Sequence, residues 1–178
     1  MKRTFLAALA LFSAVTPGCS QSEAGTHRQD HEHSAKAPAL PLAGWVTDAA
    51  HVFTAAENNR ISARLRNVER QTGSQMVVVT VTTLEQKDIK TFTSDLGNAW
   101  GIGRKGYDDG VVLLLAPNQR QARIATGSGL KAKLPDGVCQ QIMDQQMIPH
   151  FRKGDMAGGI EAGIDALAAK LGAGSVPH

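Results

Sequence analysis

The first clear pattern of apolar residues, over residues 61–68, has the spacing of a helix. A helical face is predicted by aliphatic residues three and four positions apart: Ile61, Leu65 and Val68. The helix is predicted to begin at Thr54, because Thr54-Ala-Ala-Glu57 has the form of a capping box, and to end at Gly73.

Two continuous apolar runs then predict strands that are covered on both faces. They occupy residues 75–82 and 111–116, and such runs are typical of parallel sheets. Residues 117–120 predict a turn. Alternating residues after that turn predict an antiparallel partner strand: Ala122, Ile124 and Thr126.

Three further helices are predicted from apolar faces. Their members are Ile89, Phe92, Leu96 and Trp100 in one, Val138, Ile142 and Met143 in the next, which begins near Pro135, and Ile160, Ile164, Leu167 and Leu171 in the last. The order α-β-α-β-β-α-α predicts an α/β fold. We expect an α/β/α sandwich, with a mixed, mostly parallel sheet flanked by helices.

Residues 1–18 are interpreted as a signal peptide. Lys2 and Arg3 give a positive start, and the apolar run over 5–15 is too short to span a bilayer. We therefore expect an exported protein on the periplasmic side of the cell envelope.

The junction Gly18-Cys19 suggests a bacterial lipoprotein in which Cys19 carries the lipid and anchors the chain to a membrane. Thr16-Pro17 departs from the usual residues of such signals, so ordinary cleavage nearby is the alternative. Ser20 favours the outer membrane, if the source has one.

Residues 19–43 predict a disordered tether, 44–172 one domain with its own core, and 173–178 a disordered tail. The tether contains three histidines: His27, His31 and His33. They could bind zinc or copper weakly, or belong to a solvated linker.

Charge and cysteine content exclude several classes of function. The whole chain has 19 Lys+Arg and 16 Asp+Glu; without Lys2 and Arg3 the first number falls to 17, a net charge of +1. With no basic patch and 4% aromatic residues, nucleic-acid binding is not indicated. Cys139 is interpreted as a buried structural thiol, because the phosphatase pattern Cys-x5-Arg would require arginine where the chain has Gln145.

The stretch Gly101-Ile-Gly-Arg-Lys-Gly106 satisfies G-x-G-x-x-G, but a helix precedes it and a strand follows. A dinucleotide site needs the reverse order, so we interpret the stretch as a flexible loop with Gly101 as a helix C-cap. Arg104 and Lys105 could pair with a phosphate or a binding partner, with nearby carboxylates, or with solvent.

Asp108-Asp109-Gly110 is the best candidate for a hard-cation site. Adjacent carboxylates repel each other, and Ca²⁺ or Mg²⁺ would neutralise them, although Asp-Gly is also a common turn. Asp48 could reach the same loop if the N-terminal segment packs beside the strand at Val111.

From about residue 44 to 171 the chain resembles the TPM domain family. The resemblance rests on several stretches in one order: Gly44-Trp-Val-Thr-Asp48, Thr72-Gly-Ser-Gln-Met-Val-Val-Val79, Trp100-Gly-Ile-Gly-Arg-Lys-Gly-Tyr-Asp-Asp-Gly-Val-Val-Leu-Leu-Leu115, Arg123-Ile-Ala-Thr-Gly-Ser-Gly-Leu130, Leu134-Pro-Asp136 and Ile148-Pro-His-Phe-Arg-Lys-Gly-Asp155. It implies an α/β/α sandwich. In plants the family is associated with thylakoid-lumen phosphatase activity and photosystem II repair.

The resemblance also implies a cleft that holds a divalent cation, often calcium, at positions matching Asp48 and Asp109. Where the family usually has an aromatic residue and a glutamate, this chain has Ser128 and Lys131. A base at that place should weaken cation binding if it lies near the site.

Two functional hypotheses follow. The first is a lipid-anchored binding or assembly module at the cell envelope, which binds a membrane-protein partner with or without a divalent cation. The alternative is a metal-assisted phosphatase-like hydrolase, in which Asp48 and Asp109 hold the cation and Arg104 or Lys105 neutralises the phosphate. The sequence leaves the oligomeric state open.

Overall fold

The computed structural model describes residues 40–172. The predicted signal peptide, Cys19, the three tether histidines and the C-terminal tail lie outside the described residues. Leu40, assigned to the end of the tether, lies against the domain: its carbonyl accepts a hydrogen bond of 2.9 Å from the indole Nε1 of Trp100.

One four-stranded sheet forms the centre of the domain, with the strand order β1-β2-β3-β4. The strands are β1 (Val46–Asp48), β2 (Met76–Thr80), β3 (Val111–Ala116) and β4 (Gln121–Thr126). The first three are parallel, and β4 runs antiparallel to β3.

Helices connect and cover the strands. They are α1 (Ala55–Thr72), α2 (Ile89–Trp100), α3 (Asp136–Ile142), a π-helical turn η3 (Met143–Met147), α4 (Ile148–Phe151) and α5 (Met156–Leu171). Short 3₁₀ turns, η1 (Pro117–Gln119) and η2 (Ser128–Leu130), flank β4. No helix within residues 40–172 is long and apolar enough to cross a bilayer.

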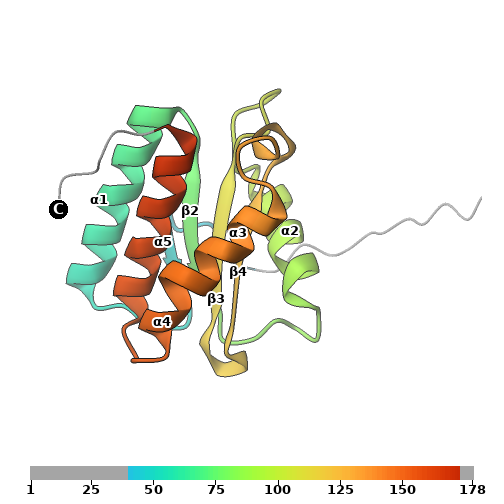
Figure 1. The fold of residues 1–178 in the computed structure, drawn as a ribbon. Helices are drawn as coiled ribbons and strands as arrows, with labels where there is room; N and C mark the ends of the chain where they lie inside the picture. The colour runs from blue at the N-terminus through green and yellow to red at the C-terminus, as the bar shows by residue number, and fades with distance from the viewer. Residues whose placement is uncertain (1–39, 173–178) are drawn as a thin grey trace, which may run out of the picture. The chain divides into compact units, whose positions relative to one another are not determined.

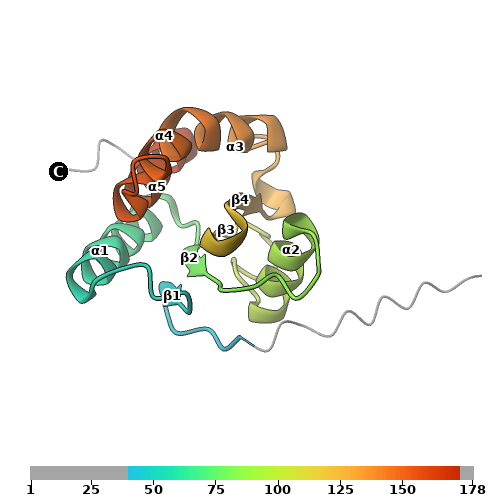
Figure 2. The same cartoon turned by 90° about the horizontal axis from the view of Figure 1, so that it is seen from below.

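The helices form two layers around the sheet. α1, α5 and the rod made by α3, η3 and α4 cover one face, and α2 covers the other (Figures 1 and 2). The predicted fold class is therefore confirmed: a mixed, mostly parallel sheet flanked by helices on both faces.

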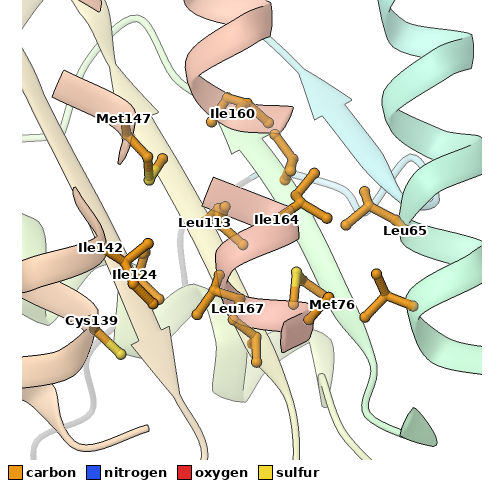
Figure 3. Close-up of a cluster of buried hydrophobic side chains, with 14 of the residues drawn as sticks. Leu65, Met76, Leu113, Ile124, Cys139, Ile142, Met147, Ile160, Ile164 and Leu167 are labelled. Carbon is orange, nitrogen blue, oxygen red and sulfur yellow. The ribbon is translucent and has the colours of Figure 1, made fainter. Parts of the chain in front are cut away.

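The larger core lies between the sheet and the layer of α1, α3 and α5. Figure 3 shows Leu113 of β3 and Met76 of β2 among side chains from these helices, including Leu65 and Ile164. The smaller core lies beneath α2, where Phe92 and Leu96 pack on Val79 and Leu114. Both central strands are thus buried on both faces, as their apolar runs predict.

The two parallel crossovers have opposite hands. Strand order advances in one direction from β1 to β3, yet α1 and α2 lie on opposite faces. Two right-handed crossovers in that order would place both helices on one face, so one of the two has the rare left-handed form. The carboxyl ends of β1 and β2 therefore lead to opposite sides of the sheet.

Local signals placed most helix ends correctly. Thr54 and Glu57 form the predicted capping box, and Gly73 ends α1 in the left-handed conformation with a φ of 74°. Gly101 ends α2 in the same way, with a φ of 61°. The sequence prediction missed β1, which is only three residues long, and the π-helical turn that joins α3 to α4.

Candidate functional site

The loop between α2 and β3 lies at the end of the sheet where strands β2 and β3 begin. Two hydrogen bonds attach it there: the Gly103 amide donates to Gln75 Oε1 at 2.8 Å, and the Val111 amide donates to the Gln75 carbonyl at 2.8 Å. Gln75 immediately precedes β2, so the start of that strand holds both ends of the loop.

Arg104 and Asp109 form an ion pair across this loop. Asp109 Oδ2 accepts hydrogen bonds from Arg104 Nε at 2.7 Å and lies 2.6 Å from Nη2, while Oδ1 accepts from the Arg104 amide at 2.8 Å. Asp109 is only 5% exposed. The pairing with a carboxylate, one of the three alternatives for Arg104, is the one that this structure contains.

The same guanidinium also links the loop to α1. Its carbon Cζ lies 4.4 Å from the centroid of the exposed Tyr107 ring, a cation–π contact. A Cβ added at Gly73 would come within 3.3 Å of Arg104 Nη1, so the guanidinium lies directly against the C-cap of α1. A cation there also interacts favourably with the helix dipole.

Burial and the arginine have opposite effects on the carboxyl group of Asp109. Burial alone would raise its pKa, but hydrogen bonds from the Arg104 side chain and amide, together with the positive charge, lower the pKa below its ordinary value. Asp109 is therefore ionised at neutral pH. The repulsion between adjacent carboxylates that suggested a cation is relieved here by Arg104.

Residues 127–129 pack against the far end of the loop, backbone to backbone. The Gly127 amide donates to the Gly110 carbonyl at 2.9 Å, and the Gly129 amide donates to the Asp108 carbonyl at 3.1 Å. A Cβ at either glycine would overlap a loop carbonyl, that of Asp108 or Tyr107. The two glycines thus allow a close backbone approach, which holds the loop in place.

A cleft of about 370 Å³ lies beside this contact, between α2 and the β4 end of the sheet. Asp108 lines it, and its Oδ2 accepts a hydrogen bond of 2.9 Å from the Ser128 hydroxyl. Ser94 and Asn98 of α2 add polar groups, and Val112 adds an apolar one. Asp109 is not among the lining residues.

Asp48 lies at the opposite end of the strands from Asp108 and Asp109. Asp48 pairs in register with Thr80, and Thr80 with Leu115, whereas Asp109 precedes the start of β3. Asp48 is therefore level with Leu115, which lies six residues of extended chain beyond Asp109, or roughly 20 Å along the strand. The condition for a shared site, packing of the N-terminal segment beside Val111, is not met, because β1 pairs with β2 instead. Asp48 and Asp109 therefore cannot hold one ion.

The carboxylate of Asp48 serves the turn that leads into α1. Its Oδ1 accepts from the Val52 amide and from the Thr80 hydroxyl, and its Oδ2 accepts from the Phe53 amide, with both amide distances 3.0 Å. These bonds hold the end of β1 to β2 and orient the chain toward the capping box. The structural environment of Asp48 is that of a turn-stabilising residue.

We expect Asp48→Ala to lower the free energy of unfolding by about 2 kcal/mol, because two part-buried amides lose a charged acceptor. Asp144→Ala is the matched control, since Asp144 is exposed and bonds only Gln140, and its effect should stay within about 0.5 kcal/mol. Urea denaturation measures both. Equal, small effects would contradict the structural role of Asp48.

The remaining candidates are dispersed around the site. Lys105 is exposed and forms no ion pair with any residue of the part described. Lys131 pairs with Asp136 at 2.5 Å, which lowers the pKa of Asp136. Burial raises the pKa of the Cys139 thiol, which suits a structural residue rather than a nucleophile.

Among residues 40–172, no three His, Cys, Asp or Glu side chains come together as a metal-binding group. Asp108 contributes one carboxylate and Ser128 one hydroxyl, whereas Ca²⁺ takes six to eight oxygen ligands. The described residues thus do not fit a closed calcium site built by this chain alone.

Sequence reasoning missed the α2 side of the cleft. A signal for it was present, because α2 carries small residues among its larger apolar ones: Thr93, Ser94 and Gly97. A Cβ at Gly97 would lie 3.3 Å from Val112 Cγ2, so the glycine lets the helix approach β3 closely.

Comparison with solved structures gives similar folds over most of the domain. The N-terminal domain of a protein from P. gingivalis is 35% identical, with a TM-score of 0.66, over 71% of this chain and 81% of that one. The N-terminal domain of the cg2496 protein from Corynebacterium glutamicum is 20% identical, with a TM-score of 0.58, over 78% and 89%. The BA42 protein from Bizionia argentinensis is 19% identical, with a TM-score of 0.61, over 67% and 81%.

A search of curated proteins gives no match. Comparison with protein families matches residues 46–170 to the TPM domain. That match covers well over half of the chain, from the first residue of β1 to the last but one of α5, and it includes the Arg104–Asp109 loop and both glycines that pack against it. The resemblance predicted from the sequence is confirmed, and the chain belongs to the TPM domain family.

Proposed function

We propose that this chain is an exported, lipid-anchored protein whose TPM domain acts as a binding or assembly module at the cell envelope. The observation that carries the proposal is the cleft between α2 and β4, which is bordered by a loop held on both sides. Arg104 and Asp109 neutralise each other within that loop, so their charges stabilise its conformation. A rigid loop beside a cleft supports recognition of a partner.

A divalent cation such as Ca²⁺ enters this proposal only through Asp108. Its carboxylate lines the cleft, and the Ser128 hydroxyl lies beside it. The other oxygen ligands would come from water and from an acidic group of the partner. Binding would then depend on calcium, although the domain by itself does not form a complete site.

A photo-crosslinking experiment tests the binding role. A photoreactive residue at Asn98, in the cleft, should capture a discrete membrane-protein partner in intact cells. The same residue at Asn59, exposed on α1 in the other helical layer, is the matched control and should capture none. Asp108→Asn should reduce capture at Asn98 about tenfold, the effect of losing one charge-assisted contact.

Two results would contradict the proposal. Equal capture from both positions would remove the cleft as a specific surface. Turnover of a phosphate ester by the wild-type chain that Asp108→Asn abolishes would establish the alternative, a metal-assisted hydrolase. The anchor is tested separately by the mass of the mature protein, because an unmodified Cys19 contradicts lipidation.

A further inference from the structure

A second and larger cleft, which we call the arginine cleft, lies on the other face of the sheet near the end of β3. Its volume is about 690 Å³, within the range of small-molecule sites. Six apolar residues form much of its lining: Leu115, Ala122, Met143, Ile148, Phe151 and Met156. They come from the sheet, the π-helical turn, α4 and the start of α5.

Two arginines, Arg120 and Arg152, line the same cleft. Neither forms an ion pair with a residue of the described range 40–172, and no acidic residue of that range is among the lining. Two acidic residues near the lining residues in the sequence have other partners: Asp144 accepts a hydrogen bond from Gln140, and Asp155 pairs with His150. Pro117 and two neutral polar residues, Gln121 and Gln140, complete the lining. The cleft is therefore partly apolar and has a net positive charge.

The backbone at Arg120 is held in a conformation that arginine does not favour. Its φ is 52°, in the left-handed region where glycine and asparagine are less strained. The turn η1 imposes it: the Arg120 amide donates to the Pro117 carbonyl at 3.0 Å, and the Asn118 side chain donates to the Thr82 carbonyl at 3.1 Å. Strain held in this way recurs at ligand sites.

The π-helical turn shapes the opposite wall. Pro149 has no amide hydrogen to continue a regular helix, and the chain accommodates it with the wider turn that contains Met143. A Cβ at Gly159 would lie 2.7 Å from Phe151 Cδ1, so α5 allows the rod to pack closely. Methionine side chains then provide an adaptable surface.

We propose that the arginine cleft binds a single-chain lipid anion. The acyl chain would lie over the six apolar residues, and the phosphate or carboxylate of the head would be held by Arg120 and Arg152. Guanidinium groups match both anions through paired hydrogen bonds. An acyl chain needs no hydrogen-bond partners, which suits the apolar part of this lining, and each methylene removed from water adds to affinity. The proposal does not depend on the cleft beside Asp108.

Calorimetric titration of the purified full chain with dodecyl phosphate, kept below its micelle concentration, tests this site. We expect Arg120→Gln and Arg152→Gln each to raise Kd about tenfold. Lys153→Gln removes one positive charge at the next, exposed position outside the lining and should change Kd less than about twofold. Ile148→Ala should weaken dodecyl phosphate roughly fivefold while leaving the response to inorganic phosphate unchanged.

Several outcomes would overturn the proposal. Inorganic phosphate binding as tightly as dodecyl phosphate would identify a simple anion site. Dodecyl maltoside binding as tightly would show nonspecific adsorption of a chain, and equal effects of Lys153→Gln and Arg152→Gln would show a bulk charge effect. Tighter binding of a short peptide ending in Leu-Phe with a free carboxylate would assign the cleft to a peptide. No binding of dodecyl phosphate would also reject the site.

Discussion

Replacing Asp109 by alanine is expected to lower the free energy of unfolding by about 3 kcal/mol. The substitution removes a buried carboxylate that accepts hydrogen bonds from the amide and Nε of Arg104 and lies 2.6 Å from Nη2, and it leaves the amide without its acceptor. Breaking a buried pair costs about 3–5 kcal/mol, and the half-exposed Arg104 places the effect at the lower end. Thermal unfolding should shift down by roughly 10 °C.

Asp108→Asn is the control for Asp109→Ala. The side chain of Asp108 is exposed and forms a hydrogen bond with Ser128, and asparagine tolerates the φ of 48° at this position. Its effect should stay within about 0.5 kcal/mol. A larger loss in Asp108→Asn than in Asp109→Ala would show that Arg104 is not the partner that stabilises this loop.

The effect of Asp109→Ala should also depend on pH. The folded state lowers the pKa of Asp109, so its contribution is complete above the ordinary aspartate pKa of about 3.9. The contribution is lost as the pH falls through the lower pKa of the folded state. Urea denaturation at pH 7, 5 and 3 should give a constant difference from the wild type at the first two values and a smaller one at the third. A constant difference at all three would contradict the ion pair.

Gly127→Ala is expected to destabilise the domain by about 3 kcal/mol, the upper end for overpacking. Its φ is −62°, which alanine adopts readily, so the whole effect is steric. The new Cβ would overlap the Asp108 carbonyl, a backbone group that moves only if the loop moves. Loss of the hydrogen bond from the Gly127 amide to Gly110 should accompany that movement.

Gly137→Ala supplies the matched control for Gly127→Ala. Nothing lies within 4 Å of a Cβ at Gly137, in the first turn of α3, so alanine there should raise stability by about 0.5–1 kcal/mol. Guanidinium denaturation of both variants measures the contrast. Similar small effects would mean that residues 127–129 do not hold the loop in place.

Much of the fold was predictable because it depends on near neighbours along the chain. The Thr54–Glu57 capping box and Gly73 set the ends of α1, and the apolar run of β3 gave its bounds without error. The strand β1 escaped prediction because three residues carry no periodic signal; it exists because β2 offers an unpaired edge. The π-helical turn accommodates Pro149, and α4 then packs closely on α5 at Gly159.

The candidate site was predicted only in part. The sequence by itself determined which residues are charged or small around the loop: Arg104, Asp108, Asp109 and the glycines at 127 and 129. It also determined the fold class and the family. The apposition of Asp108 and Ser128 at a cleft depends on β4 returning antiparallel beside β3.

Only the tertiary structure decided which charges meet. The parallel direction of β1, β2 and β3 placed Asp48, at the end of β1, and Asp109, before the start of β3, at opposite ends of the strands. The turn at Gly103 brought Arg104 onto Asp109. The tertiary structure also brought together Arg120 and Arg152, which are 32 positions apart in the sequence, at the arginine cleft. The physical reason is range: capping and periodicity act within a few residues, whereas ion pairs and clefts depend on strand order and helix packing, which join segments distant along the chain.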